Sequence, residues 1–318
     1  MKKILITGAA GYIGSCLLAY LSKKYTVYGL DKIKKKNIYK ADLTNIKITN
    51  KILKKIMPDA IIHLAGQSTI DGIGSRKKYI KNNEIATANI IKLMKTNDIK
   101  NIFFSSTAAV YKGNSKQNLT EKSKIEPNNI YGITKLKCEK LIKKNKINYI
   151  IFRFFNVCSS IPSLKVGELH EPETHLIPLS INKILGNKNI NIYGNNFKTR
   201  DGTCIRDYIH ILDLCAAFDK TLEKLFKNKI SKEIINLGSG KGYSNLEIIK
   251  NIVNITKKNN YKYKFVQRRK GDIAKLVCSY EKAKSIINWK PHNSTLEKII
   301  KDEIKWQKIN NYERKFIY

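Results

Sequence analysis

The residues whose types and spacing first suggest chemistry are Tyr131 and Lys135, which lie four positions apart in the stretch Tyr-Gly-Ile-Thr-Lys. On a helix, residues four apart share one face, so the phenol and the ammonium would be neighbours. A free phenol has a pKa of about 10 and is a poor base at neutral pH, but a nearby cation favours the phenolate. The pair therefore predicts a group that can take a proton from a hydroxyl. The spacing by itself is weak support, because it occurs by chance in many helices.

The elements that precede this pair are typical of a nucleotide-binding fold. An apolar run at residues 4–6 predicts a strand buried on both faces, and Gly8, Gly11 and Gly14 follow it, just before a helical pattern. Glycines there allow a tight turn and let the backbone approach a pyrophosphate at the helix N-terminus. A second strand ends at Asp31, about 20 residues beyond the glycines, where a carboxylate accepts hydrogen bonds from a ribose diol and repels a 2′-phosphate. These features favour NAD over NADP; the alternative is a solvated acid at the end of a strand.

Strands and helices continue to alternate through residue 154. One further strand is expected at 61–66, with His63 interpreted as structural, and another at 101–104, with a helix around 83–94 between them. Ligands bind at the carboxyl ends of the strands in a doubly wound sheet, so Thr107 is placed to hydrogen-bond a reacting group. The alternation predicts an α/β fold with a doubly wound parallel (Rossmann) sheet and a smaller mixed α/β substrate-binding lobe. We expect a cofactor domain at residues 1–157, rejoined by about 207–230, and a mainly substrate-binding domain at 158–318.

Composition restricts the classes of protein to be considered. The chain of 318 residues is long enough for two lobes, and its first strand begins too early to leave room for a signal peptide. Its apolar runs are shorter than the ~20 residues that cross a bilayer. Its six cysteines are scattered, which predicts reduced thiols, a cytoplasmic location and neither a disulfide frame nor a metal site.

The formal net charge of +36 allows two interpretations, a binder of nucleic acid or membrane surfaces, or compositional drift toward lysine. The lysines are spread along the chain without interleaved aromatic residues, so we favour drift and expect neither a specific nucleic-acid partner nor a membrane partner. The basic turn at 267–272 is either a clamp for an anionic ligand or a solvated loop, and its sequence does not separate the two.

Taken together, these motifs resemble the extended short-chain dehydrogenase/reductase superfamily and, within it, the UDP-glucose 4-epimerase family. The resemblance runs nearly from end to end, and its most specific segment is residues 194–210; residues 153–157 and 172–178 agree with it. It implies an isomerase of galactose and nucleotide-sugar metabolism that uses NAD to oxidise C4 of a UDP-hexose and then returns the hydride to the opposite face. UDP-galactose and UDP-glucose would thereby be interconverted. A homodimer is implied by analogy alone.

The resemblance also implies roles for individual residues. Tyr131 would be the base, Lys135 would hold the nicotinamide ribose and tune the tyrosine, and Thr107 would occupy the catalytic serine/threonine position. The implied cofactor contacts are Gly8, Gly11, Tyr12, Ile13, Gly14, Asp31, Asp42, Leu43, Leu64, Ala65, Gly66, Asn83, Ser105, Tyr131, Lys135 and Phe155. The implied substrate contacts are Thr107, Tyr131, Asn156, His175, Leu176, Tyr193, Arg206, Arg269, Asp272 and Leu276.

Some positions depart from the family pattern: Ser68 stands where lysine is common, Lys112 where glycine is common, and the loop at 32–40 is short. Ala108 and Ala109 stand where dehydratases of the superfamily carry an Asp-Glu pair, which disfavours a dehydratase or a glutamate-dependent decarboxylase. Three alternatives stay open. They are a reductase that releases NAD(H), a 4-epimerase for UDP-N-acetylglucosamine or UDP-glucuronate, and a non-enzymatic nucleic-acid binder or redox sensor.

Overall fold

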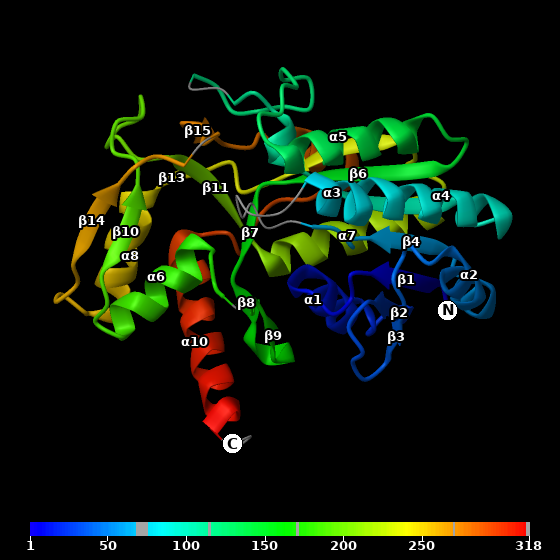
Figure 1. Ribbon diagram of the computed structural model, residues 1–318, viewed down its shortest axis with the longest axis horizontal. Coiled ribbons are helices and arrows are strands. Elements are labelled where there is room, and N and C mark those ends of the chain that lie inside the picture. Colours follow the sequence, from blue (N-terminus) through cyan, green and yellow to red (C-terminus); the bar gives the residue numbers. More distant parts are fainter. Residues whose placement is uncertain (68–75, 114–115, 170–171, 270, 316–318) are drawn as a thin grey trace. The chain divides into compact units, whose positions relative to one another are not determined.

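We describe the chain from a computed structural model, which places residues 1–67, 76–113, 116–169, 172–269 and 271–315. The helices and strands, shown in chain order in Figure 1, form two compact units, and each is described by itself. Unit 1 comprises Met1–Lys112, Ile125–Phe154 and Asp219–Ile235. Unit 2 comprises Gly113–Lys124, Phe155–Phe218 and Asn236–Tyr318.

Unit 1 is built on a sheet that, within the described residues, has seven strands in the order β12-β6-β5-β4-β1-β2-β3. The strands are β1 (Lys3–Thr7), β2 (Thr26–Asp31), β3 (Ile38–Lys40), β4 (Ala60–His63), β5 (Asn101–Thr107), β6 (Asn148–Phe154) and β12 (Glu233–Leu237), whose last two residues belong to unit 2. From β6 to β3 every pairing is parallel. The predicted doubly wound parallel sheet is therefore confirmed.

The helices of unit 1 pack on this sheet. They are α1 (Tyr12–Leu21), α2 (Ile46–Ile56), α3 (Arg76–Tyr79), a π-helix η1 (Ile80–Ile85), α4 (Ala86–Thr96), a 3-10 turn η2 (Ala108–Val110), α5 (Ile130–Lys143) and the second half of α7 (Ile211–Phe226). Leu5, Ile61 and Phe104 belong to a core cluster shared with α2, α4 and α5. Their strand neighbours Ile4 and Phe103 are equally buried. Because successive strand residues point to opposite faces, the sheet is covered on both sides.

Unit 2 has smaller sheets. β10 (Ile190–Tyr193) pairs in parallel with β14 (Tyr263–Val266), and β8 (Ser160–Ile161) pairs antiparallel with β9 (Val166–Gly167). β11 (Ile205–His210) pairs with β7 (Asn156–Cys158), β13 (Gly242–Ser244) and β15 (Lys275–Leu276). The helices are η3 (Pro162–Leu164), α6 (Leu176–Leu185), the first half of α7, α8 (Asn245–Thr256), α9 (Glu281–Ile287) and α10 (Leu296–Lys315). Isoleucines of α6, α8, α10 and β10 form the core of this unit. Among the described residues, no helix is both long and apolar enough to cross a membrane.

Candidate functional site

The turn between β1 and α1 has the shape that a dinucleotide requires. Gly8 has φ of +73°, and a Cβ added there would lie 2.8 Å from the backbone nitrogen of Ala65. A Cβ added at Gly14 would overlap the carbonyl oxygen of Gly8. Gly11 precedes α1 without a side-chain cap, and the first turn of the helix carries no acidic residue. Backbone N–H groups and the helix dipole therefore favour an anion here, which fits a pyrophosphate.

The Asp31 carboxylate lies directly beside this turn. It accepts hydrogen bonds from the N–H of Ala10 at 3.0 Å and from the N–H of Ile33 at 3.0 Å. The short loop that follows also reaches the turn, because Lys35 Nζ donates to the carbonyl of Ala10 at 3.1 Å. The glycine turn and the acid thus form one local arrangement that fits the adenosine half of NAD.

Asp42 lies just beyond β3, the strand to which this loop leads. Burial acts to raise the pKa of Asp42, but hydrogen bonds from Thr44 and the charge of Lys32 lower it overall. Lys32 Nζ is 3.2 Å from the Asp42 carboxylate and donates to the Asn82 side chain at 2.7 Å. The expected loop at 32–40 thus ends in a strand, β3, and Lys32 ties its first residue to the segment that follows this strand.

Thr107, Tyr131 and Lys135 come together at the carboxyl end of β5. Thr107 ends the strand, and its hydroxyl accepts from the N–H of Ala109 at 3.1 Å. Tyr131 lies in the first turn of α5, which is capped by the side chain of Asn129, and the phenol is hydrogen-bonded to Thr107. Lys135 is buried and donates from Nζ to the carbonyl of Ser105 at 2.8 Å, with Nζ 5.9 Å from the centre of the Tyr131 ring.

The acidity of these groups is governed by burial. Burial raises the pKa of Tyr131 to about 12, although the hydrogen bond to Thr107 acts to lower it. Burial also lowers the pKa of Lys135 to about 8, against the charges of Cys138 and Glu139. The side chains alone thus make the phenol a weaker acid than a free tyrosine. A further positive charge is needed before Tyr131 can serve as a base near neutral pH.

A buried ion pair between Glu139 and Arg153 lies behind this group. Sequence reasoning missed it, and the only available signal was the position of Glu139 one helical turn after Lys135. Arg153 on β6 donates from Nε and Nη2 to the Glu139 carboxylate at 3.0 and 2.7 Å. Arg153 also donates from Nη1 to the Tyr111 hydroxyl at 2.9 Å, and Ser106 is hydrogen-bonded to Glu139. This network joins α5 to β5 and β6 directly beneath Thr107.

Asn83 is held by the π-helix rather than by the expected regular helix, which begins at Ala86. Its side-chain oxygen accepts from the N–H of Gln67 at 2.7 Å, and its amide donates to the Thr134 hydroxyl at 3.0 Å. Asn83 therefore ties the segment that follows β4 to α5. A π-helix of one turn inside an α-helix is often associated with functional sites.

His63 is structural, as interpreted from the sequence. Both ring nitrogens are hydrogen-bonded, to Thr7 at 2.7 Å and to Thr87 at 3.0 Å. Burial, with the nearby charge of Lys135, lowers the pKa of His63 to about 3, so the ring is neutral. Ser68, which departs from the family pattern, lies outside the described residues.

In unit 2 the expected substrate residues form separate groups. Arg206 on β11 donates to the carbonyl of Ile273 at 2.6 Å and lies 3.5 Å from the Asp272 carboxylate. Leu276 on β15 is the register partner of Arg206, so these two side chains lie on the same face of the sheet. Asn156 lies on β7, another partner of β11, and Phe155 precedes it in the same unit. His175 is the N-cap residue of α6, and Leu176 is the first residue of that helix.

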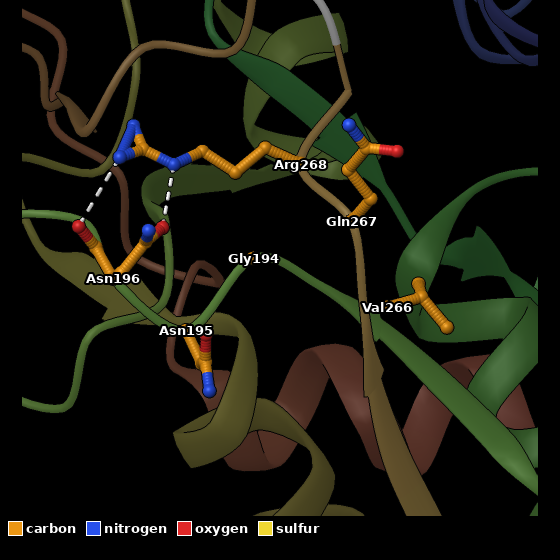
Figure 2. A pocket seen from close by; sticks show the side chains of 6 residues that line it. All are labelled: Gly194, Asn195, Asn196, Val266, Gln267 and Arg268. Atoms are coloured by element: carbon orange, nitrogen blue, oxygen red, sulfur yellow. Dashed lines mark hydrogen bonds between the residues drawn. The ribbon is translucent and has the colours of Figure 1, made fainter.

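The basic turn serves two purposes. The Arg269 guanidinium lies 4.0 Å from the centre of the Tyr193 ring, which brings two expected substrate residues together. Arg268 instead makes contacts within the protein. Its guanidinium lies 4.3 Å from the centre of the Phe197 ring and donates to the Asn196 side chain at 2.6 Å. Figure 2 shows the hydrogen bond between Arg268 and Asn196, which lies beside a cavity. The volume of this cavity is about 360 Å³. The cavity is lined by Gly194, Asn195, Asn196, Val266, Gln267 and Arg268.

Comparison with known proteins gives matches over nearly the whole chain. Residues 4–238 match the NAD dependent epimerase/dehydratase family. The UDP-glucose 4-epimerase of Halalkalibacterium halodurans is 35% identical over 320 residues, which cover 96% of this chain and 95% of that protein. The UDP-glucose 4-epimerase of Lactobacillus helveticus is 34% identical and covers 98% of this chain and 100% of its own length. The crystal structure of UDP-glucose 4-epimerase from Bifidobacterium longum in complex with NAD+ and UDP has a TM-score of 0.89 at 28% identity, with 98% of this chain and 99% of that chain covered.

Proposed function

This chain belongs to the NAD dependent epimerase/dehydratase family, and we propose that it interconverts UDP-galactose and UDP-glucose by NAD-dependent epimerisation at C4 of the sugar. It is an isomerase of the UDP-hexose 4-epimerase type, with NAD as cofactor. The observation that carries the proposal is the grouping of Thr107, Tyr131 and Lys135 at the carboxyl end of β5. This group of three residues lies in unit 1, and the glycine turn and Asp31 of the same unit fit the cofactor.

Tyr131 is the proposed proton carrier. Direct inversion of C4 is difficult because its C–H bond is not acidic, whereas oxidation of the 4-hydroxyl to a ketone makes the carbon planar. Bound NAD supplies reversible acceptance of the C4 hydride. Tyr131 takes the hydroxyl proton at its phenolic oxygen and returns it after the sugar has turned over. Thr107, hydrogen-bonded to the phenol, orients the oxygen that exchanges the proton.

The raised pKa of Tyr131 gives the oxidised cofactor a second role. Burial holds the pKa of Tyr131 at about 12, and Lys135 Nζ is bound to the Ser105 carbonyl. A positively charged nicotinamide ring near the phenol would favour the phenolate. Proton removal by Tyr131 would thus be coupled to the oxidised state of the cofactor, which suits an enzyme that must start each cycle with oxidation.

The substrate contacts are proposed from the groups in unit 2. Arg206, fixed by the Ile273 carbonyl and by Asp272, is suited to a pyrophosphate, because guanidinium groups form strong charge-assisted hydrogen bonds with phosphate oxygens. The Arg269 guanidinium stacks on the Tyr193 ring. These two flat groups together are suited to contact a nucleobase and its phosphates. Firm binding of the UDP moiety would leave the sugar free to rotate.

The short turn after Thr107 supports an epimerase over a dehydratase. Ala108 and Ala109 form the 3-10 turn η2, and the carbonyl of Ala109 would be overlapped by a Cβ at Gly132. Helix α5 therefore packs closely on a turn whose side chains are methyl groups. These residues offer no acid for the removal of water.

One experiment tests the function directly. Purified protein would be given UDP-galactose without added cofactor, and UDP-glucose would be measured by chromatography. Formation of UDP-glucose supports epimerisation with retained NAD. Stoichiometric formation of NADH with release of a keto sugar would favour the reductase alternative instead.

The assembly and location of the protein are also proposals. We propose a homodimer in the cytoplasm, by analogy with the family. All six cysteines are buried and free of disulfides in the described part of the chain, which supports a reducing compartment. Light scattering on the purified protein would check the dimer, since a monomeric mass at micromolar concentration would contradict it.

A further inference from the structure

A second cluster of titratable side chains lies in unit 2, where β9, α6 and α10 meet (Figure 1). It consists of Glu168, Glu173 and His175, whose nearest donor atoms all lie within 4.8 Å of one another. His175 Nδ1 is 2.6 Å from one oxygen of Glu168 and 3.4 Å from one oxygen of Glu173. Two carboxylates and an imidazole therefore converge on one point.

The fold fixes these side chains from three directions. The carbonyl of Glu168, just after β9, accepts a hydrogen bond from Trp306 Nε1 of α10 at 2.8 Å. Gln307, also on α10, donates to the carbonyl of Pro178 in α6 at 3.2 Å. Because His175 is the N-cap residue of α6, α10 holds both sides of the cluster in place. The convergence is thus built by packed elements rather than by a single loop.

Glu303 on α10 is a separate sign that this region binds a positive charge. It is fully buried, and one of its oxygens accepts from Gln307 at 3.1 Å. The other oxygen has no hydrogen-bond partner among the described residues. Burial, together with the charges of Glu168 and Glu173, raises the pKa of Glu303 to about 8, so the three carboxylates lie within electrostatic reach of one another. Buried acceptors without a partner are uncommon and often mark an ion or water.

The cluster is open to solvent on one side. The side chain of Glu168 is 1% exposed, that of Glu173 is 14% exposed and that of His175 is 52% exposed. A cation could therefore enter past His175 and reach the buried carboxylate of Glu168. The carboxylates of Glu173 and Glu168 lie along this path, and negative charge of this kind would attract a dication.

We propose that Glu168, Glu173 and His175 bind a divalent transition-metal ion, for which zinc is the best match, and that Glu303 supports the site from behind. Zinc accepts both imidazole nitrogen and carboxylate oxygen as ligands, whereas calcium and magnesium prefer oxygen ligands alone. Three protein ligands leave a fourth position for water. The scattered cysteines, which led us to expect no metal site, have no part in this set of ligands.

Binding is an exchange of a proton for the metal. The 2.6 Å separation between His175 Nδ1 and Glu168 is that of a hydrogen bond. Zinc bonds of about 2.0–2.1 Å in a tetrahedron place the ligand atoms about 3.3 Å apart, so these two atoms need to separate by about 0.7 Å. The proton on Nδ1 leaves to solvent, and the ring nitrogen donates its lone pair to the metal.

The test uses full-length protein without an affinity tag, cleared of metal by a chelator and titrated with zinc chloride by calorimetry. We expect one zinc per chain, with about a 10-fold or greater loss of affinity in Glu168→Gln and in Glu173→Gln. Glu303→Gln should weaken binding by about 10–100-fold, as outer-shell changes do. Glu297→Gln is the matched control, because Glu297 is an exposed acid on the same helix, and it should bind zinc like the parent.

The proposal does not depend on the epimerase activity, and the readout is metal binding alone. It is overturned if the parent shows no saturable binding at tens of micromolar zinc. It is equally overturned if Glu168→Gln and Glu173→Gln bind as tightly as Glu297→Gln. Should circular dichroism show that Glu168→Gln does not fold, the more exposed Glu173→Gln decides the outcome. Cobalt substitution adds a second readout, since tetrahedral coordination gives visible absorption that should vanish in Glu173→Gln.

Discussion

Replacing Glu139 by glutamine is expected to destabilise unit 1 by about 3–5 kcal/mol, the usual cost of breaking one partner of a buried ion pair. Glu139 receives two hydrogen bonds from Arg153, at 3.0 and 2.7 Å. Both side chains are only 2% exposed, so water cannot replace the lost interaction. Glutamine keeps the shape of the side chain, but it leaves the guanidinium charge buried without a counter-charge and turns an N–H group toward it.

Glu84→Gln is the matched control for this change. Glu84 also faces a cation, with its carboxylate 3.3 Å from Lys137 Nζ, but the lysine is 51% exposed. Exposed pairs contribute about 0–1 kcal/mol because water and salt screen them. Desolvation therefore accounts for the expected difference between the two variants. Replacing both Glu139 and Arg153 by apolar residues should recover part of the loss, since no charge is then left buried.

The assay must report on unit 1 itself. Both tryptophans, Trp289 and Trp306, belong to unit 2, so their fluorescence follows the other unit. Hydrogen exchange of the β5 and β6 amides, measured in increasing urea, gives the free energy of unfolding of the sheet that carries Arg153. A difference of less than about 1 kcal/mol between Glu139→Gln and Glu84→Gln would refute the reasoning, because the buried pair would then behave like an exposed one.

Other predictions concern the reaction. Tyr131→Phe should lower turnover by about 10²–10⁴-fold while NAD retention, measured by absorbance after gel filtration, is unchanged; ordinary turnover would exclude Tyr131 as the base. Asp31→Ala should weaken NAD retention. If the variant retains as much NAD as the parent protein, Asp31 does not bind the ribose. Gly14→Ala should also lose NAD, because the added methyl group overlaps the Gly8 carbonyl. Leu276 is smaller than an aromatic gate, so UDP-N-acetylglucosamine should be turned over; if only UDP-galactose reacts, that idea fails.

The acidity of Tyr131 illustrates a limit of local reasoning. The spacing of Tyr131 and Lys135 correctly places both on one face of α5, because helix geometry is a local property. From the pair alone we expected the ammonium to lower the pKa of the phenol. Burial instead raises that pKa to about 12, and Lys135 directs Nζ to the Ser105 carbonyl. The cost of desolvating a phenolate depends on the whole fold, and no short motif contains it.

The sequence by itself determined the parallel sheet, the glycine turn beside Asp31 and the helix that carries Tyr131. These follow from apolar periodicity, backbone freedom at glycine and residue spacing, which act over a few residues at a time. The tertiary structure alone decided which distant side chains meet. It paired Glu139 with Arg153 and Arg206 with Asp272, and it brought Glu303 within electrostatic reach of Glu168 and Glu173. Such contacts depend on how separate elements pack and on what becomes buried, and both are set only when the chain is folded.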